Sequence, residues 1–151
     1  MKKISFIGLG NMGLEMAINL SKSNYEVIGF DIDQHMYKQL EENNIKCVSS
    51  IEKALNNPDV VITMLPDGKI VKSVWEKIIS ILTNKPLAID CSTIDIENAS
   101  IFHDLAKKQN LRSLDAPVSG GVIGAKNGSL TFMVGGNVDD YNEAKSLFDI
   151  M

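Results

Sequence analysis

The chain of 151 residues has little of several residue types, and each scarcity narrows its possible functions. Its 15 lysine and arginine residues are outnumbered by 19 aspartate and glutamate residues, which gives a formal net charge of −4. Such a balance leaves no basic excess for nucleic acid or an anionic membrane surface. No apolar run approaches the roughly 18 residues that cross a bilayer. We therefore expect neither nucleic acid nor a membrane as a partner.

Reactive thiols and metal ligands are also scarce, because the chain has only 2 cysteines and 2 histidines. Cys47 and Cys91 lie far apart without C-x-x-C spacing, so we expect both to be buried, reduced thiols. His35 and His103 lack metal-ligand spacing and fall in helical patterns that face solvent. No metal site is expected. The N-terminus lacks a small-residue cleavage site, which favours a cytoplasmic or matrix-type protein, and we expect the cytoplasm.

What the chain does have is a regular alternation of short apolar runs and amphipathic stretches, within a composition ordinary for a globular domain. The predicted strands are Lys3–Ile7, Glu26–Phe30, Val60–Met64, Leu87–Asp90, Ser113–Pro117 and Leu130–Val134. The predicted helices are Met12–Lys22, Gln34–Asn43, Ile51–Asn56, Lys69–Ile81, Glu97–Gln109 and Tyr141–Met151. Continuous apolar strands that alternate with helices indicate an α/β fold of the Rossmann-like, doubly wound type. We expect a mostly parallel sheet with helices on both faces, and residues 1–151 as one domain.

The first strand runs into a G-x-G-x-x-G turn, which reads Gly8-Leu9-Gly10-Asn11-Met12-Gly13. The turn lies between a predicted strand and a predicted helix, and an acid follows the next predicted strand. This context is typical of a dinucleotide-binding fingerprint. Gly8 permits the tight turn, Gly10 lets the backbone approach a pyrophosphate, and Gly13 lets the helix pack on the strand. The free N–H groups at the helix start favour phosphate binding.

The acid of this fingerprint is Asp31, 18 residues after Gly13. Its carboxylate is expected to accept hydrogen bonds from a ribose 2′-hydroxyl, whereas a 2′-phosphate would meet a like charge. The only arginine, Arg112, is far along the chain, so NAD is favoured over NADP. Asp33 is expected to cap the helix predicted to begin at Gln34.

Polar and glycine-rich segments follow three further predicted strands, at the edge where a doubly wound sheet binds ligands. They are Met64–Asp67, Asp90–Thr93 and Asp115–Gly121. In the last segment, Ser119, Gly120 and Gly121 form either an anion-binding concavity of backbone N–H groups or a loop that needs positive φ. Asp90 and Asp115 are expected to order their loops rather than to serve as bases.

Four separated motifs resemble the β-hydroxyacid dehydrogenase family, and the 3-hydroxyisobutyrate dehydrogenases within it. Besides the glycine turn with Met16–Leu20 after it, they are Asp90–Asp95, Asp115–Val122 and Leu130–Gly136. The resemblance implies hydride transfer between NAD and a short β-hydroxyacid. It implies that Leu65, Pro66 and Thr93 line the nicotinamide and ribose side of the NAD site. It also implies that Ser119, Gly120 and Gly121 hold the substrate.

The resemblance further implies a catalytic lysine in a glycine-rich segment that is expected to lie beyond Met151. Lys145 has neither the glycines nor the asparagines of that segment, so residues 1–151 offer no candidate catalytic residue. The helical domain that completes the catalytic site and the homo-oligomer interface in the family is likewise expected to be absent. The chain alone is therefore expected to be inactive.

Two other functions remain open from the sequence. One is a stand-alone module that binds or senses NAD without catalysis, which the missing lysine favours. The other is the corresponding domain of a tartronate semialdehyde reductase-like enzyme. A 6-phosphogluconate dehydrogenase is a more distant alternative, because Asp31 stands where that group prefers an asparagine and arginine pair for NADP.

Overall fold

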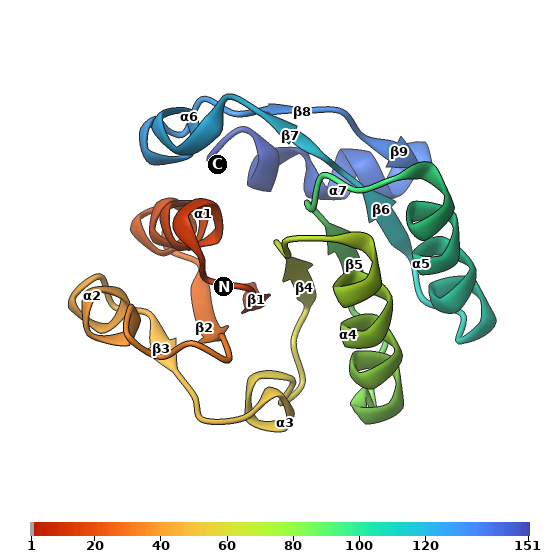
Figure 1. Cartoon of the computed structure of the whole chain (residues 1–151), viewed down its shortest axis with the longest axis horizontal. Coiled ribbons are helices and arrows are strands. Elements are labelled where there is room, and N and C mark those ends of the chain that lie inside the picture. Colours follow the sequence, from red (N-terminus) through yellow and green to blue (C-terminus); the bar gives the residue numbers. More distant parts are fainter. Residues whose placement is uncertain (1) are drawn as a thin grey trace.

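The alternating segments of the chain fold into three layers, with helices on either side of a central sheet (Figure 1). The computed structural model describes residues 2–151. The strands are β1 (Lys3–Ile7), β2 (Glu26–Phe30), β3 (Lys46–Cys47), β4 (Val60–Thr63), β5 (Leu87–Asp90), β6 (Ser113–Asp115), β7 (Val118–Ser119), β8 (Thr131–Phe132) and β9 (Gly135–Gly136). The helices are α1 (Asn11–Lys22), α2 (Tyr37–Glu42), α3 (Ile51–Ala54), α4 (Gly68–Ile81), α5 (Ile96–Lys108), α6 (Gly121–Asn127) and α7 (Val138–Phe148).

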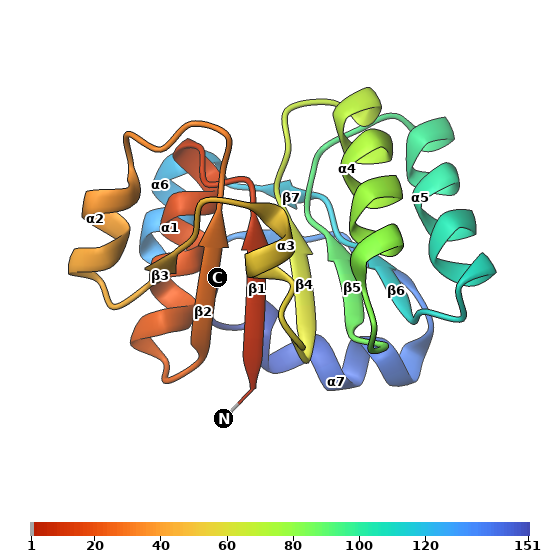
Figure 2. The ribbon, with the colours of Figure 1, turned by 90° about the horizontal axis from the view of Figure 1, so that it is seen from below.

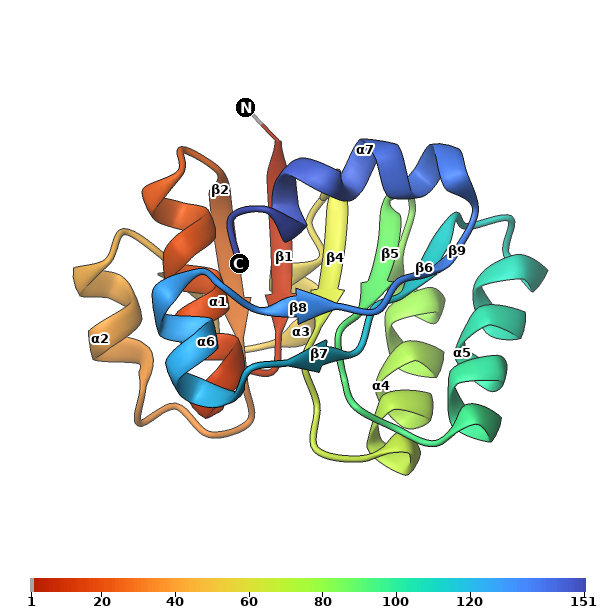
Figure 3. The same ribbon diagram turned by 90° about the horizontal axis from the view of Figure 1, so that it is seen from above.

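The central sheet has seven strands in the order β3-β2-β1-β4-β5-β6-β9. All neighbours pair in parallel except β6 and β9, which are antiparallel. The chain winds outward from β1 first to β2 and β3, then returns and continues through β4, β5 and β6. This reversal places a crevice at the carboxyl ends of β1 and β4, where such folds bind ligands. Strands β7 and β8 form a separate antiparallel pair, close to the carboxyl ends of the central strands in Figure 3.

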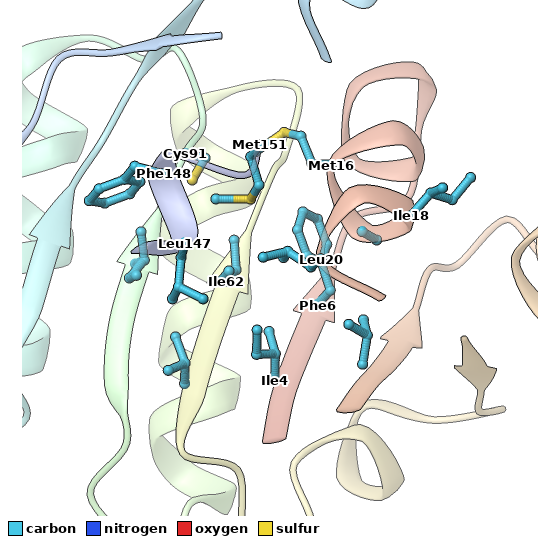
Figure 4. Packing of buried hydrophobic residues seen from close by; sticks show 14 of the residues in the cluster. Ile4, Phe6, Met16, Ile18, Leu20, Ile62, Cys91, Leu147, Phe148 and Met151 are labelled. Atoms are coloured by element: carbon cyan, nitrogen blue, oxygen red, sulfur yellow. The ribbon is translucent and has the colours of Figure 1, made fainter. Parts of the chain in front are cut away.

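Each face of the sheet has its own apolar core, and Figure 2 shows the helices on the α4 and α5 side in front of the strands. Phe6 and Leu20 pack with Leu147 on the α1 and α7 side (Figure 4). On the opposite side Trp75 and Phe102 bring their ring centroids to 4.7 Å. Because side chains alternate along a strand, the fully buried β4 supplies both cores, as the continuous apolar runs predicted.

The predicted fold class is confirmed, and the longest elements agree with the predictions. Strands β1, β2 and β5 have the predicted bounds, and helices α1, α4 and α5 begin and end within one residue of theirs. These segments carry the clearest apolar periodicity, which is the signal on which the predictions rested.

Other elements differ from the predictions. The run Leu130–Val134 is not a strand of the parallel sheet, because only Thr131–Phe132 is extended and it pairs with β7. Strand β4 ends at Thr63, β6 ends at Asp115, and α7 occupies Val138–Phe148 instead of Tyr141–Met151. Helix α3 ends at Ala54, two residues earlier than predicted. The short elements β3, β7, β9 and α6 were not predicted.

The segment after β2 shows why one predicted cap was wrong. Helix α2 begins at Tyr37 instead of Gln34, and its cap position is Met36. The carboxylate of Asp33 accepts a hydrogen bond from the His35 N–H at 3.1 Å, which closes a local turn before the helix. Aspartate stabilises such turns as readily as it caps helices, so the sequence alone does not distinguish a turn at Asp33 from a helix N-cap.

Burial of Cys91 and exposure of both histidines are confirmed, whereas Cys47 is not fully buried and His35 lies in a turn before α2 instead of in a helix. Cys91 is buried, Cys47 is half-buried, and both are free thiols. His35 and His103 are exposed, and Nδ1 of His103 lies 2.8 Å from Oγ of Ser113. Over residues 2–151, no helix combines the length and apolar character that a membrane crossing needs.

Asp67 caps the N-terminus of α4, because its carboxylate accepts a hydrogen bond from the Ile70 N–H at 2.9 Å. We expect Asp67→Ala to lower the free energy of unfolding by about 1 kcal/mol, since it leaves that donor to solvent alone. Chemical denaturation measures the change. Asp67→Asn retains an acceptor and should stay within about 0.5 kcal/mol of the unmodified chain. An equal loss in both variants would contradict the capping role.

Candidate functional site

The turn between β1 and α1 is held against the ends of two neighbouring strands. Gly8 has φ +94°, and its N–H donates to the Phe30 carbonyl at 3.0 Å. A Cβ on Gly8 would lie 2.2 Å from the Met64 carbonyl oxygen, and one on Gly13 would lie 2.0 Å from the Gly8 carbonyl oxygen. Neither position accommodates a side chain, so the glycines are required for the close approach that the motif predicted.

The start of α1 is open towards solvent. Gly10 occupies the cap position with no side-chain hydrogen bond to the helix, and the first turn contains no acidic residue. Apart from Gly10 and its neighbours along the chain, no atom of the described residues lies within 4 Å of the place where a Cβ on Gly10 would stand. The N–H groups of the first turn therefore face free space with the positive end of the helix dipole behind them. This arrangement favours an anionic group such as a phosphate.

Asp31 stands beside this turn at the carboxyl end of β2, in a fixed position. One carboxylate oxygen accepts the Leu9 N–H at 2.6 Å, and the other accepts the Asp33 N–H at 2.8 Å. The Asp31 N–H donates to the Tyr37 hydroxyl at 3.1 Å. Each carboxylate oxygen can accept more than one hydrogen bond, so Asp31 retains acceptor capacity for a hydroxyl of a ligand.

The glycine turn and Asp31 lie along one groove with a volume of about 480 Å³. Its second wall comes from the segment that follows β4 and from α4, which contribute Met64, Leu65, Pro66, Ile70 and Val74. The groove thus combines a phosphate-attracting helix start, an acid and apolar walls. These are the features that bind a dinucleotide at the switch point of a doubly wound sheet.

Behind the second wall lies a buried polar cluster, formed by Thr63, Trp75, Asp90 and Ser92. Oδ1 of Asp90 accepts the hydroxyl of Thr63 at 2.6 Å and the hydroxyl of Ser92 at 2.7 Å. Trp75 Nε1–H donates to the Thr63 hydroxyl at 3.0 Å, and the Leu65 N–H donates to the Ser92 hydroxyl at 2.9 Å. Burial raises the pKa of Asp90 from 3.8 to about 6, in spite of these hydrogen bonds.

The structure brings most of the predicted cofactor residues together. Those that line the groove are Gly8, Gly10, Asn11, Met12, Gly13, Asp31, Leu65 and Pro66. Leu9 is buried beneath the turn, and its backbone N–H rather than its side chain takes part in the site.

The other predicted site residues do not line this groove. Thr93 is exposed on the segment after β5, next to the buried Ser92. Ser119, Gly120 and Gly121 are exposed where β7 passes into α6, and both glycines have positive φ (134° and 63°). They therefore meet the backbone requirement of a loop, and the anion-binding alternative stays a prediction.

Several groove residues were missed from the sequence. They are Ile7, Phe30, Ile32, Asp33, Ile51, Ile70 and Val74, whereas Met64 belongs to the segment that was expected at this edge of the sheet. Ile32 is 92% exposed, and the sequence signal that could have found it is an isoleucine between Asp31 and Asp33, just beyond the end of a strand. Ile70 and Val74 stand four residues apart and so share one face of α4, which places them on the groove only once the helix is oriented.

Comparison with known proteins identifies the family of the chain. The model of one protein family, described as the NAD binding domain of 6-phosphogluconate dehydrogenase, matches residues 3–151. The chain is 41% identical over 153 residues to a probable mitochondrial 3-hydroxyisobutyrate dehydrogenase of Dictyostelium discoideum, covering 99% of this chain and 48% of that protein. It is 40% identical to an NAD-dependent L-serine dehydrogenase of Pseudomonas aeruginosa, covering 100% of this chain and 52% of that protein.

Among solved structures, the chain is similar to the 3-hydroxyisobutyrate dehydrogenase of Mycobacterium tuberculosis determined with L-serine. The TM-score is 0.96 at 38% identity, covering 100% of this chain and 52% of that one. The chain thus spans about half the length of the relatives it matches.

The buried Asp90 makes stability depend on pH in a defined direction. Its folded-state pKa of about 6 exceeds the ordinary 3.8, so the folded state binds the proton more tightly than the unfolded state. The contribution of Asp90 to the free energy of unfolding is therefore largest below about pH 4 and falls as the pH rises through 6. We expect the stability difference between the unmodified chain and Asp90→Asn to fall by about 2 kcal/mol between pH 4 and 7.

Denaturant unfolding of both proteins at several pH values measures this difference. A difference that stays constant from pH 4 to 7 would contradict a raised pKa at Asp90.

Proposed function

The chain belongs to the family described as the NAD binding domain of 6-phosphogluconate dehydrogenase. From this membership and from its similarity to 3-hydroxyisobutyrate dehydrogenases, we propose that it is the NAD-binding domain of a 3-hydroxyisobutyrate dehydrogenase-like oxidoreductase. The observation that carries the proposal is a single groove that contains both the uncapped start of α1 and the carboxylate of Asp31. Each is weak alone, since many helices start at glycine and many loops contain an acid. Together they match two polar parts of an adenosine diphosphate moiety, the pyrophosphate and the ribose hydroxyls.

The residues of the groove fit NAD. The open space at Gly10 leaves room for the pyrophosphate against the N–H groups of Asn11 and Met12. The Asp31 carboxylate would accept hydroxyl groups of the adenosine ribose, and Leu65 and Pro66 would lie along the nicotinamide half. Thr93 would join that half from the segment after β5.

Charge supports NAD over NADP. The Asp31 carboxylate would repel a 2′-phosphate, and no cationic side chain lines the groove in the part of the chain that the structure describes. Arg112 belongs to another region, where its guanidinium pairs with Asp140 and Glu143.

The relatives suggest the class of substrate. The names of two of them give 3-hydroxyisobutyrate and L-serine, both of which carry a carboxylate and a hydroxyl on the third carbon. We propose that Ser119 and the N–H groups around Gly120 and Gly121 bind such a carboxylate. NAD supplies the hydride acceptor when it is bound, and the hydroxyl oxygen must lose a proton in the same reaction.

The groove offers no free base next to its nicotinamide half. Its ionisable side chains over residues 2–151 are Asp31 and Asp33, both beside the glycine turn. We therefore propose that the proton acceptor, a lysine by the family resemblance, belongs to a second domain outside residues 1–151. That domain would also provide the homo-oligomer interface. The free thiols suit a reducing compartment such as the cytoplasm.

The first test is a calorimetric titration of the chain with NAD, with NADP as the comparison ligand. We expect saturable binding that prefers NAD by at least about tenfold, because of the charge at Asp31. Gly10→Ala should weaken NAD binding by about tenfold or more, since its methyl group would occupy the space meant for the pyrophosphate. Its free energy of unfolding should change by less than about 1 kcal/mol, because that methyl group meets no protein atom.

Gly13→Ala is the matched comparison, because the same added methyl group there meets the Gly8 carbonyl oxygen. It should lower the free energy of unfolding by several kcal/mol, whereas Gly10→Ala should not. Undiminished NAD binding by a folded Gly10→Ala variant would contradict the assignment of the pyrophosphate site.

Hydride transfer is tested by fusing residues 1–151 to the second half of the Dictyostelium discoideum relative. We expect the fusion to reduce NAD with 3-hydroxyisobutyrate or L-serine, measured by absorbance at about 340 nm, and the chain alone to give no turnover. A fusion that binds NAD but oxidises neither acid would contradict the dehydrogenase function.

Ser119→Ala in the fusion should raise KM for the acid about tenfold, because the variant lacks the hydroxyl proposed to bind the carboxylate.

A further inference from the structure

The hydrogen bonds behind the second wall of the groove have a fixed direction. Trp75 Nε1–H and the Leu65 N–H can only donate, so the hydroxyls of Thr63 and Ser92 must accept from them. Each hydroxyl has one proton, and each lies within 2.7 Å of the same oxygen of Asp90. Both series of hydrogen bonds therefore end on Oδ1 of Asp90, which is their common acceptor.

These two series of hydrogen bonds connect Asp90 to α4 and to Leu65, which form the second wall of the groove. One runs from Asp90 on β5 through Thr63 on β4 to Trp75 on α4, the helix whose Ile70 and Val74 face the groove. The other runs from Asp90 through Ser92 to the backbone of Leu65, which itself lines the groove. Ser92 also precedes Thr93 in the chain.

All of the side chains in this cluster are closed off from water. Thr63, Trp75, Asp90 and Ser92 are each 0% exposed. The second oxygen of Asp90 is buried with no hydrogen-bond partner among the described residues. Burying a carboxylate in this way is unfavourable by itself, so a purely structural role would be served as well by an apolar side chain. A buried carboxylate at this position is explained if its hydrogen bonds hold the second wall of the groove in place.

We propose that Asp90 is a positioning residue, whose carboxylate fixes Leu65 through Ser92 and α4 through Thr63 and Trp75, and thereby sets the wall against which the nicotinamide half of the cofactor lies. The inference rests on the proposed function for the identity of the ligand, although the hydrogen-bond geometry stands without it. Asp90 touches no ligand-facing surface itself. It acts through the two hydroxyls.

Its neighbour in the sheet provides a matched control. Asp115 on β6 is in register with Asp90, and it too has a buried oxygen without a partner. Asp115 makes no hydrogen bond to Leu65, Ser92 or α4 among the described residues, and it faces a different hollow, beside α5. Asp115→Asn therefore changes the local charge to the same extent without cutting either series of hydrogen bonds.

The experiment compares four variants of the 151-residue chain by calorimetry with NAD and with ADP-ribose, which lacks only the nicotinamide ring. They are Ser92→Ala, Asp90→Leu, Asp90→Asn and Asp115→Asn. In Ser92→Ala we expect NAD affinity to fall about tenfold while ADP-ribose affinity stays within about twofold, because one hydrogen bond to the wall is lost. Asp90→Leu should lose at least as much. Asp90→Asn retains an acceptor oxygen and should recover part of the loss, and Asp115→Asn should match the unmodified chain.

Amide hydrogen exchange without any ligand provides the second measurement. The Leu65 N–H should exchange at least about tenfold faster in Ser92→Ala than in the unmodified chain, and at an unchanged rate in Asp115→Asn. Ser92→Ala keeps the test decisive if Asp90→Leu does not fold.

Three results would overturn the proposal. They are an unchanged NAD affinity in a folded Ser92→Ala variant, an equal loss for NAD and ADP-ribose, and an unchanged exchange rate at Leu65. If the unmodified chain binds neither ligand, the proposed function fails, and the exchange rate at Leu65 alone then decides whether Ser92 and Asp90 hold the wall.

Discussion

The close approach of the β1–α1 turn to the carboxyl ends of β2 and β4 is the constraint on which the site depends. A methyl group at Gly8 or Gly13 would collide with backbone oxygen atoms, so the turn reaches this position only because both residues lack a side chain. The approach brings the start of α1 beside Asp31 and lets the carboxylate bind the turn through Leu9. The same contacts therefore hold the fold together and form one side of the groove.

The two sides of the groove are stabilised by different means. Backbone packing and the half-buried carboxylate of Asp31 define the glycine side, whereas buried side-chain hydrogen bonds define the side formed by Leu65 and α4. Backbone contacts of this kind tolerate little change in sequence. A hydrogen-bonded wall can shift when one hydroxyl or carboxyl group changes, which makes it the more adjustable side of the site.

How far the sequence predicted this structure depended on how local each signal is. The glycine turn and Asp31 were found because their chemistry lies within a short stretch with fixed spacing. The role of Leu130–Val134 was misjudged, because an apolar run does not reveal whether it joins the central sheet or pairs with a two-residue strand elsewhere. The links from Asp90 to Leu65 and Trp75 were also missed, since they depend on which strands are neighbours and on how α4 is turned. Sequence spacing alone carries neither fact.

Trp75 has a practical consequence for this fold. It is the only tryptophan in the chain, it is fully buried, and its indole N–H binds Thr63 directly behind the groove wall. All indole fluorescence therefore originates from one site between α4 and the central sheet. The protein carries its own optical reporter, so a displacement of α4 can be followed through the emission spectrum without attaching a dye.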